Sequence, residues 1–351
     1  MEHVLVLKIF FIVYLIKIKM KTNTLIISEM ACSHEGDFTL AKKIIDASAV
    51  AKADVVQLQI WSLQYMMSPQ RKEYELLKKI EFSPQQWREL ITYSRVNYPN
   101  MQIYVCVYEH STIEFIDSLG IDGYKINSSD LSNPLVLNKV AVTGKPINLS
   151  VGASTIAEIQ SAVKRISSIS ESPITLMYGH QSFPTRPENV NMSYMKKLGN
   201  LFELSIGYQD HCDADDDSAF WLPAASMGMD VSVMEKHITH DRSLKGIDHE
   251  SALNPDEFIK FVKMVRTIDQ AKGINTPREF SADEIKYREF QKKSIVVAKG
   301  MKAGSILKEG DLSFMRAERL GIPPNKIDTV LGKELKSDIS AYQPLTQDSF
   351  R

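Results

Sequence analysis

Short apolar segments recur along the chain, and each is followed by a segment with the periodicity of an amphipathic helix. Because the apolar segments lack polar alternation, they are typical of strands that are buried on both faces of a sheet. We predict such strands over Thr24–Ser28, Val55–Ile60, Ile103–Val107, Gly123–Ile126, Pro146–Ser150, Ile174–Tyr178, Phe202–Ile206 and Val231–Glu235.

The segments between the strands predict helices. Ser83 directly before Pro84 is typical of a helix start, and Thr155 with Glu158 has the pattern of a capping box. We predict helices over Leu40–Ala51, Pro84–Arg95, Ile113–Leu119, Pro134–Val142, Ile156–Ile166, Tyr194–Leu198, Ser218–Met227 and Pro255–Gln270.

The alternation of strands and helices from Thr24 to Gln270 indicates the fold class. Its span is close to the roughly 250 residues of an α/β (β/α)8 TIM barrel. An open, doubly wound sheet is the alternative. No G-x-G-x-x-G motif follows the first strand, which disfavours the nucleotide-binding form of that sheet.

The composition changes after Gln270. Residues 271–285 are polar and contain Gly and Pro, which predicts a linker. Residues 286–351 contain short β-type runs separated by Gly turns, which predicts a small β-rich module. We therefore predict an extension over residues 1–19, a barrel domain over 20–285 that includes the linker, and a C-terminal module over 286–351.

The N-terminal extension contains an apolar stretch, Ile9–Ile16, between lysines. It is shorter than a transmembrane helix, which needs about 20 apolar residues. No small-x-small cleavage site of a signal peptide follows it. A signal peptide is one interpretation of residues 1–19. The other is that they lie outside the fold and that Met20 is the native start, and no part of the chain is expected in a membrane.

The overall charge narrows the classes of partner. The 351 residues include 42 Lys+Arg and 43 Asp+Glu, which gives a net charge of −1 and argues against nucleic-acid binding. The three cysteines, Cys32, Cys106 and Cys212, lie far apart and predict neither a disulfide framework nor a metal knuckle. A reducing cytoplasm is therefore expected.

Polar residues gather where the predicted strands end, which is the active-site face of a TIM barrel. His211 and His237 follow neighbouring strands, so they could share a divalent metal ion such as Mn²⁺, with a structural role for each as the alternative. Glu29 could act in catalysis or cap a loop. Lys125 could clamp a phosphate or carboxylate, form a Schiff base or be solvated. The remaining candidates at these strand ends are Gln57, Gln59, Ser128, Ser150 and Gln181.

Several motifs, in order, resemble one known family. The segment IISEMACSHEGDFTLAKKIIDAS is similar to the opening of the N-acetylneuraminate (sialic acid) synthases, which read roughly IIAE-x-G-x-NHNG there. YKINSSD resembles the family's YKIxSGE, LSVGAST resembles LSTGMAT, and FPTRPENVNM resembles YPTP-x-E-x-VNL. IGYQDH and MEKHITHDRSLKGIDHESALNPDEF follow in the family's order, so the resemblance extends from about Thr24 to the C-terminus.

The resemblance implies a TIM barrel with a C-terminal antifreeze-like (SAF) domain, which in the family reaches over the partner's active site in a domain-swapped homodimer. It implies a cytoplasmic transferase that condenses phosphoenolpyruvate with an N-acyl amino sugar, such as N-acetylmannosamine, to a nonulosonic acid and phosphate. It also implies Mn²⁺ as the metal ion, with Mg²⁺ or Co²⁺ as alternatives. The implied roles are catalysis by Glu29, metal binding by His211 and His237, phosphoenolpyruvate binding by Gln57, Gln59, Lys125, Ser128, Ser150 and Gln181, and sugar binding by Asp248 and Arg316.

The chain also departs from the family pattern within the expected site. VQLQ stands where the family has VKFQ, so Gln57 replaces a lysine that binds phosphoenolpyruvate. If no other residue compensates, the lost cationic contact costs about 1.5–3 kcal/mol in binding. Gln181 replaces an asparagine and Gln209 a serine. These changes keep two alternatives open: a legionaminic or pseudaminic acid synthase, and a catalytically silent sugar-phosphate-binding paralogue. Lys125 itself gives a third alternative, an aldolase that uses it as a Schiff base.

Overall fold

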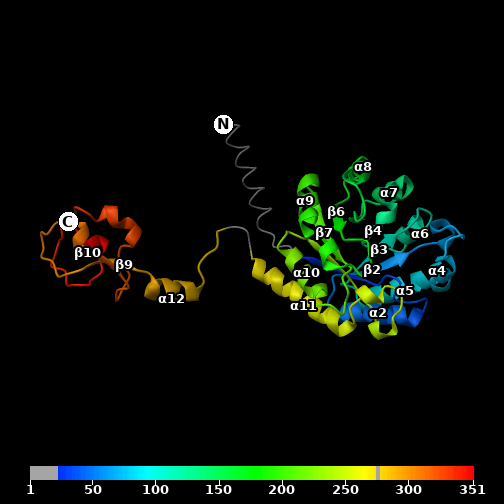
Figure 1. Cartoon of the computed structure of the whole chain (residues 1–351), viewed down its shortest axis with the longest axis horizontal. Coiled ribbons are helices and arrows are strands. Elements are labelled where there is room, and N and C mark those ends of the chain that lie inside the picture. Colours follow the sequence, from blue (N-terminus) through cyan, green and yellow to red (C-terminus); the bar gives the residue numbers. More distant parts are fainter. Residues whose placement is uncertain (1–22, 274–276) are drawn as a thin grey trace. The chain divides into compact units, whose positions relative to one another are not determined.

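The computed structural model describes residues 23–273 and 277–351, which form two compact units (Figure 1). The expected extension over residues 1–19 lies outside the described residues. Within the described ranges, no helix is long and apolar enough to cross a membrane.

The first unit is a closed barrel of parallel strands, which confirms the predicted TIM barrel. Each strand pairs with the next along the chain, and β1 pairs with β8 to close the sheet. The strands are β1 (Leu25–Glu29), β2 (Val55–Ile60), β3 (Gln102–Val107), β4 (Gly123–Ile126), β5 (Ile147–Ser150), β6 (Ile174–Tyr178), β7 (Ser205–Asp210) and β8 (Val233–His237).

Helices connect the strands and surround the barrel (Figure 1). The Ser83 cap with Pro84 and the Thr155–Glu158 capping box form as predicted, because their side chains satisfy amide groups at the helix starts. The helices of this unit are α2 (Phe38–Val50), α3 (Leu63–Met66), α4 (Tyr74–Ile80), α5 (Pro84–Asn97), α6 (Ile113–Ser118), α7 (Pro134–Val142), α8 (Ile156–Ser167), α9 (Met192–Phe202), α10 (Ser218–Met227) and α11 (Pro255–Lys272).

Two strands begin later in the sequence than predicted. The predicted strand Phe202–Ile206 begins in what is the end of α9, which stops at Glu203 in the left-handed conformation (φ 53°). Strand β7 starts at Ser205, and β8 likewise starts at Val233 instead of Val231. As a result, polar residues that sequence reasoning placed after these strands lie within them.

The barrel interior has an apolar layer below a polar one. Ile27, Val55 and Val233 belong to a buried apolar cluster inside the barrel. Because side chains two residues apart share a face of a strand, Glu29 and Glu235 extend the same inward rows toward the carboxyl ends of β1 and β8. Most other apolar side chains form a larger core between the strands and the helices.

The second unit contains helix α12 (Ala282–Gln291) and an antiparallel pair, β9 (Ser294–Val297) and β10 (Leu312–Met315). It has its own apolar core, which includes Ile295, Leu335 and Leu345. Helix α12 begins inside the segment that the sequence indicated as a linker. Its start is stabilised by a capping box between Ser281 and Glu284.

Candidate active site

Two buried carboxylates and one lysine meet inside the barrel at the carboxyl ends of its strands. Lys125 Nζ on β4 lies 2.5 Å from Glu235 Oε1 on β8 and 3.7 Å from Glu29 Oε2 on β1. Both carboxylate side chains are fully buried, and that of Lys125 is 6% exposed. The lysine therefore bridges two acids that are 206 residues apart in the sequence.

The surroundings of Glu29 shift its pKa. Burial raises the pKa of Glu29 to about 7, although the positive charge of Lys125 lowers it in part. The carboxylate also accepts hydrogen bonds from the Ala31 amide at 2.8 Å and from Gln59 Nε2 at 3.3 Å. A carboxyl group with a pKa near neutrality can both accept and donate a proton, as acid–base catalysis requires.

Lys125 remains an ammonium group in this cluster. Burial opposes its charge, but the attraction of Glu235 and Glu29 outweighs burial and raises the pKa of Lys125. A Schiff-base lysine must lose its proton to attack a carbonyl, so this geometry disfavours the aldolase alternative. A buried ammonium group can instead pair with an anionic group of a ligand.

Gln57 contacts both acids. Its Nε2 donates to Glu29 and, at 3.0 Å, to Glu235 Oε2. Its Oε1 is buried and has no hydrogen-bond partner. Gln57 therefore holds the two carboxylates but adds no positive charge to the cluster.

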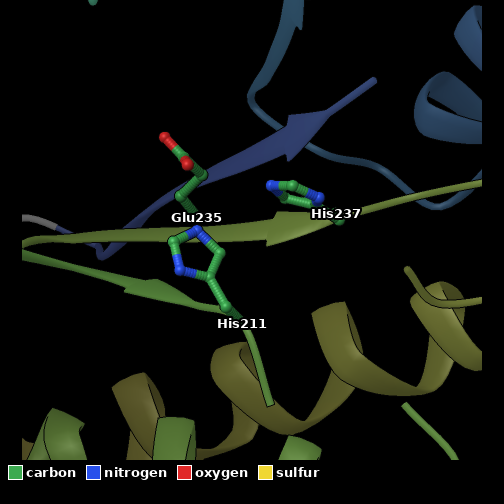
Figure 2. Close-up of side chains that lie close together, drawn as sticks. All are labelled: His211, Glu235 and His237. Atoms are coloured by element: carbon green, nitrogen blue, oxygen red, sulfur yellow. The ribbon is translucent and has the colours of Figure 1, made fainter. Parts of the chain in front are cut away.

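His211, directly after β7, and His237, the last residue of β8, meet with Glu235 at the same end of the barrel (Figure 2). One ligand atom from each residue lies within 4.8 Å of the other two, and all three residues are buried. This places the two predicted histidines together and adds Glu235, which sequence reasoning missed. The signal was in the sequence: Glu235 and His237 are two residues apart, so they share one face of a strand.

Both histidines fit a metal ion. Burial lowers the pKa of His211 and of His237, which favours the neutral imidazole that metals bind. His211 Nδ1 lies 2.9 Å from the His180 carbonyl oxygen, a contact that leaves Nε2 free. His237 Nδ1 is buried without a hydrogen-bond partner, so it has an unused lone pair or proton. The donor set of two imidazoles and a carboxylate suits a divalent transition metal.

The other predicted anion-binding residues lie around the same barrel end. Ser150 ends β5 and exchanges hydrogen bonds with Gln209 on β7, at 3.0 Å and 3.2 Å. Gln181 follows β6, with its Nε2 3.5 Å from the Gly179 carbonyl oxygen. Ser128 lies in the short 3-10 turn Ser128–Asp130 after β4.

The two predicted sugar-binding residues, Asp248 and Arg316, lie in different units of the structure. Asp248, in the loop after β8, accepts a hydrogen bond from the Cys32 amide at 3.4 Å, and burial raises the pKa of its carboxyl group. Its loop therefore contacts the loop after β1, beside Glu29. Arg316 is exposed and follows β10 in the second unit, so its role stays a prediction.

Two family profiles match the chain. The profile of the NeuB family matches residues 44–277, well over half of the chain. The chain belongs to the NeuB family. The SAF domain profile matches residues 292–351, which confirms the predicted C-terminal module.

Relatives of this NeuB-family chain cover three quarters of its length or more. An uncharacterized protein of Methanocaldococcus jannaschii is 30% identical over 90% of this chain and 91% of its own. The N,N'-diacetyllegionaminic acid synthase of Campylobacter jejuni is 28% identical over 89% of this chain and 95% of its own. A crystal structure of N-acetylneuraminic acid (sialic acid) synthetase from Leptospira borgpetersenii, in complex with citrate, has a TM-score of 0.70 and 27% identity, covering 76% of this chain and 92% of its own.

Proposed function

We propose that this protein condenses phosphoenolpyruvate with an N-acyl amino sugar to a nonulosonic acid and releases phosphate. The observation that carries the proposal is the meeting of Glu29, Lys125 and Glu235 with His211 and His237 at one end of the barrel. Membership of the NeuB family supports it, as do the synthases among its relatives.

The proposed reaction forms one carbon–carbon bond and breaks one carbon–oxygen bond. C3 of phosphoenolpyruvate attacks the aldehyde carbon of the open-chain sugar, and the aldehyde oxygen takes a proton to become a hydroxyl group. Water adds at C2 and loses a proton. The tetrahedral intermediate then loses phosphate by cleavage of the C2–O bond, which leaves a keto group at C2.

Glu29 is proposed as the group that moves these protons. It lies at the end of β1, beside the loop that contains Asp248, and its pKa of about 7 lets it exchange protons near neutral pH. Lys125 is proposed to face the carboxylate or phosphate of phosphoenolpyruvate, since it is a buried ammonium group. Gln57, Gln59, Ser128, Ser150 and Gln181 are proposed as further donors to the same substrate.

His211 and His237, with Glu235, are proposed to hold a divalent ion, Mn²⁺ before Mg²⁺ or Co²⁺. Such an ion would stabilise the negative charge that develops on the aldehyde oxygen. The contact between His211 and the His180 carbonyl fixes one imidazole for this role.

The second unit is proposed to supply Arg316 to the acceptor sugar bound by a partner chain, in a domain-swapped homodimer that works in the cytoplasm. The SAF profile over residues 292–351 identifies the domain that contains Arg316.

A silent sugar-phosphate-binding protein is the second candidate, because Gln57 contributes no charge where the sialic acid synthases have a lysine. An assay of phosphate release with Mn²⁺, phosphoenolpyruvate and a panel of N-acyl hexosamines separates the two. The proposal expects release that requires both substrates, is lost in Glu29→Gln and is retained in Glu114→Gln, which changes an exposed glutamate on α6. If no sugar in the panel leads to phosphate release from phosphoenolpyruvate, the result would support the silent protein.

A further inference from the structure

An aromatic ring lies against the two histidines of the candidate site. Phe183 is in the loop after β6, and its ring centroid is 4.4 Å from that of His211 and 6.2 Å from that of His237. The centroids of the two imidazoles are 5.4 Å apart, so the three rings form one cluster. Phe183 is 49% exposed, whereas each histidine is 4% exposed. The phenyl ring therefore lies at the boundary between solvent and the imidazoles.

The loop that contains Phe183 is attached to His211 on both sides of the ring. Before Phe183, the His180 carbonyl oxygen lies 2.9 Å from His211 Nδ1. After it, the Thr185 amide donates to the His211 carbonyl oxygen at 2.7 Å. Thr185 Oγ1 also donates to the Ser182 carbonyl oxygen at 2.7 Å. Because the backbone is held on both sides, the ring can leave the histidines by rotation of its side chain while the loop stays in place.

Protein groups fill the other directions around the histidines. Inside the barrel, the apolar layer that includes Val233 lies toward the amino ends of the strands. Glu235 is beside the histidines, with Lys125 Nζ 2.5 Å from its Oε1. Outside β7 and β8, Asp210 and Lys236 form an ion pair that is 0% exposed. This leaves the barrel mouth, where Phe183 lies, as the route from solvent to the histidines.

We propose that Phe183 is the gate of the metal site, and that a divalent ion enters and leaves past its ring when the ring rotates off the imidazoles. The inference rests on the metal site of the proposed function. A gate differs from a residue that orients metal ligands. Because the ring contact opposes entry and release equally, its loss accelerates both and leaves the affinity unchanged, whereas loss of an orienting contact weakens the affinity.

Metal exchange in Phe183→Ala tests the gate. Isothermal titration calorimetry of the full chain gives the Kd for Mn²⁺, release into an excess of a coloured chelator gives the off-rate, and the ratio of off-rate to Kd gives the rate of entry. We expect release and entry each to be about three- to tenfold faster than in the parent, the factor that corresponds to one aromatic pair contact. The Kd should change by less than about twofold, because both rates rise together.

Two further variants serve as controls. Phe183→Tyr keeps the ring and should exchange Mn²⁺ at the rates of the parent. Leu201→Ala changes a residue that is 51% exposed on α9, the helix that follows the same loop, and should also leave both rates unchanged. Circular dichroism of all three variants checks that the fold is kept.

Chemical modification of histidines tests the cover without a metal ion. Diethyl pyrocarbonate acylates neutral imidazoles that it can reach, and mass spectrometry of peptides locates the modified residues. In the metal-free protein, we expect His211 and His237 to react about three- to tenfold faster in Phe183→Ala than in the parent, because the same ring contact is lost. His110, in the loop after β3, should react at the same rate in both proteins.

Unchanged exchange rates, or unchanged reactivity of His211 and His237, in Phe183→Ala would overturn the gate. A Kd weakened by the whole change in release rate would also overturn it, because that result marks an orienting residue. Phosphate release that requires Mn²⁺, together with unchanged exchange in Phe183→Ala, would refute the gate alone. Faster exchange without phosphate release from phosphoenolpyruvate would support the gate and contradict the proposed reaction. Failure of the parent to bind Mn²⁺ would contradict both.

Discussion

A buried ion pair ties together the two strands that carry the histidines. Lys236 Nζ lies 2.5 Å from Asp210 Oδ2, and both side chains are 0% exposed. Tyr208 donates to the other carboxylate oxygen of Asp210 at 2.8 Å. Asp210 directly precedes His211, and Lys236 directly precedes His237, so the pair holds the ends of β7 and β8 in register.

Removing one charge of this pair should destabilise the fold more than removing both charges. Lys236→Met leaves the Asp210 carboxylate buried without its cation, which typically costs about 3–5 kcal/mol in the free energy of unfolding. The double variant Asp210→Asn/Lys236→Met removes both buried charges. We expect the double variant to lose less stability than Lys236→Met alone, because no uncompensated charge remains.

Urea unfolding followed by tryptophan fluorescence measures this cost. All three tryptophans, Trp61, Trp87 and Trp221, lie in the barrel unit, so the signal reports unfolding of that unit. Calorimetry with Mn²⁺ adds a functional measurement, and we expect affinity to fall about 10–100-fold in Lys236→Met, as for other residues that orient metal ligands. A cost of Lys236→Met below about 1 kcal/mol, or a double variant that is no more stable than Lys236→Met, would refute the reasoning.

Three further predictions concern single residues. His237→Asn should weaken Mn²⁺ binding at least 100-fold by calorimetry; unchanged affinity would remove His237 from the metal site. Burial lowers the pKa of His34 to about 4 from 6.5, so the neutral ring stabilises the fold above pH 6.5 and that stability is lost as the pH falls toward 4. Between pH 7 and 4.5, the free energy of unfolding of His34→Asn should therefore fall by about 2 kcal/mol less than that of the parent, as measured by urea unfolding. Equal decreases in the two proteins would contradict a lowered pKa of His34. Gln57→Lys should lower the KM for phosphoenolpyruvate about tenfold or more, and a raised KM would show that Gln57 is adapted to this site.

The barrel was predictable because its strands and helices have distinct periodicities. Where the prediction of strands failed, the cause was local: the apolar residues Phe202 and Leu204 flank a helix end, while β7 continues into the polar residues Gln209 and Asp210. A pattern of apolar residues underestimates the length of a strand whose last inward-facing residues are polar residues of a site. The strand that ends at His237 was cut short for the same reason.

From the sequence, only the location of the candidate site residues at the ends of the strands could be predicted, and not the contacts between them. That Glu29, Gln57, Lys125 and His237 lie at one barrel end follows from parallel topology. That Lys125 lies closer to Glu235 than to Glu29 depends on strand register and side-chain rotamers, which a single sequence does not encode in any local pattern.

The most direct test of the account follows one oxygen atom through the reaction. The full chain is incubated with Mn²⁺, the acceptor sugar that it binds, and phosphoenolpyruvate that carries ¹⁸O at the oxygen between C2 and phosphorus. Mass spectrometry should find an unlabelled nine-carbon keto acid and labelled phosphate, and neither product with Glu29→Gln. Absence of the keto acid, or label in its keto group, would contradict the proposed condensation with cleavage of the C2–O bond.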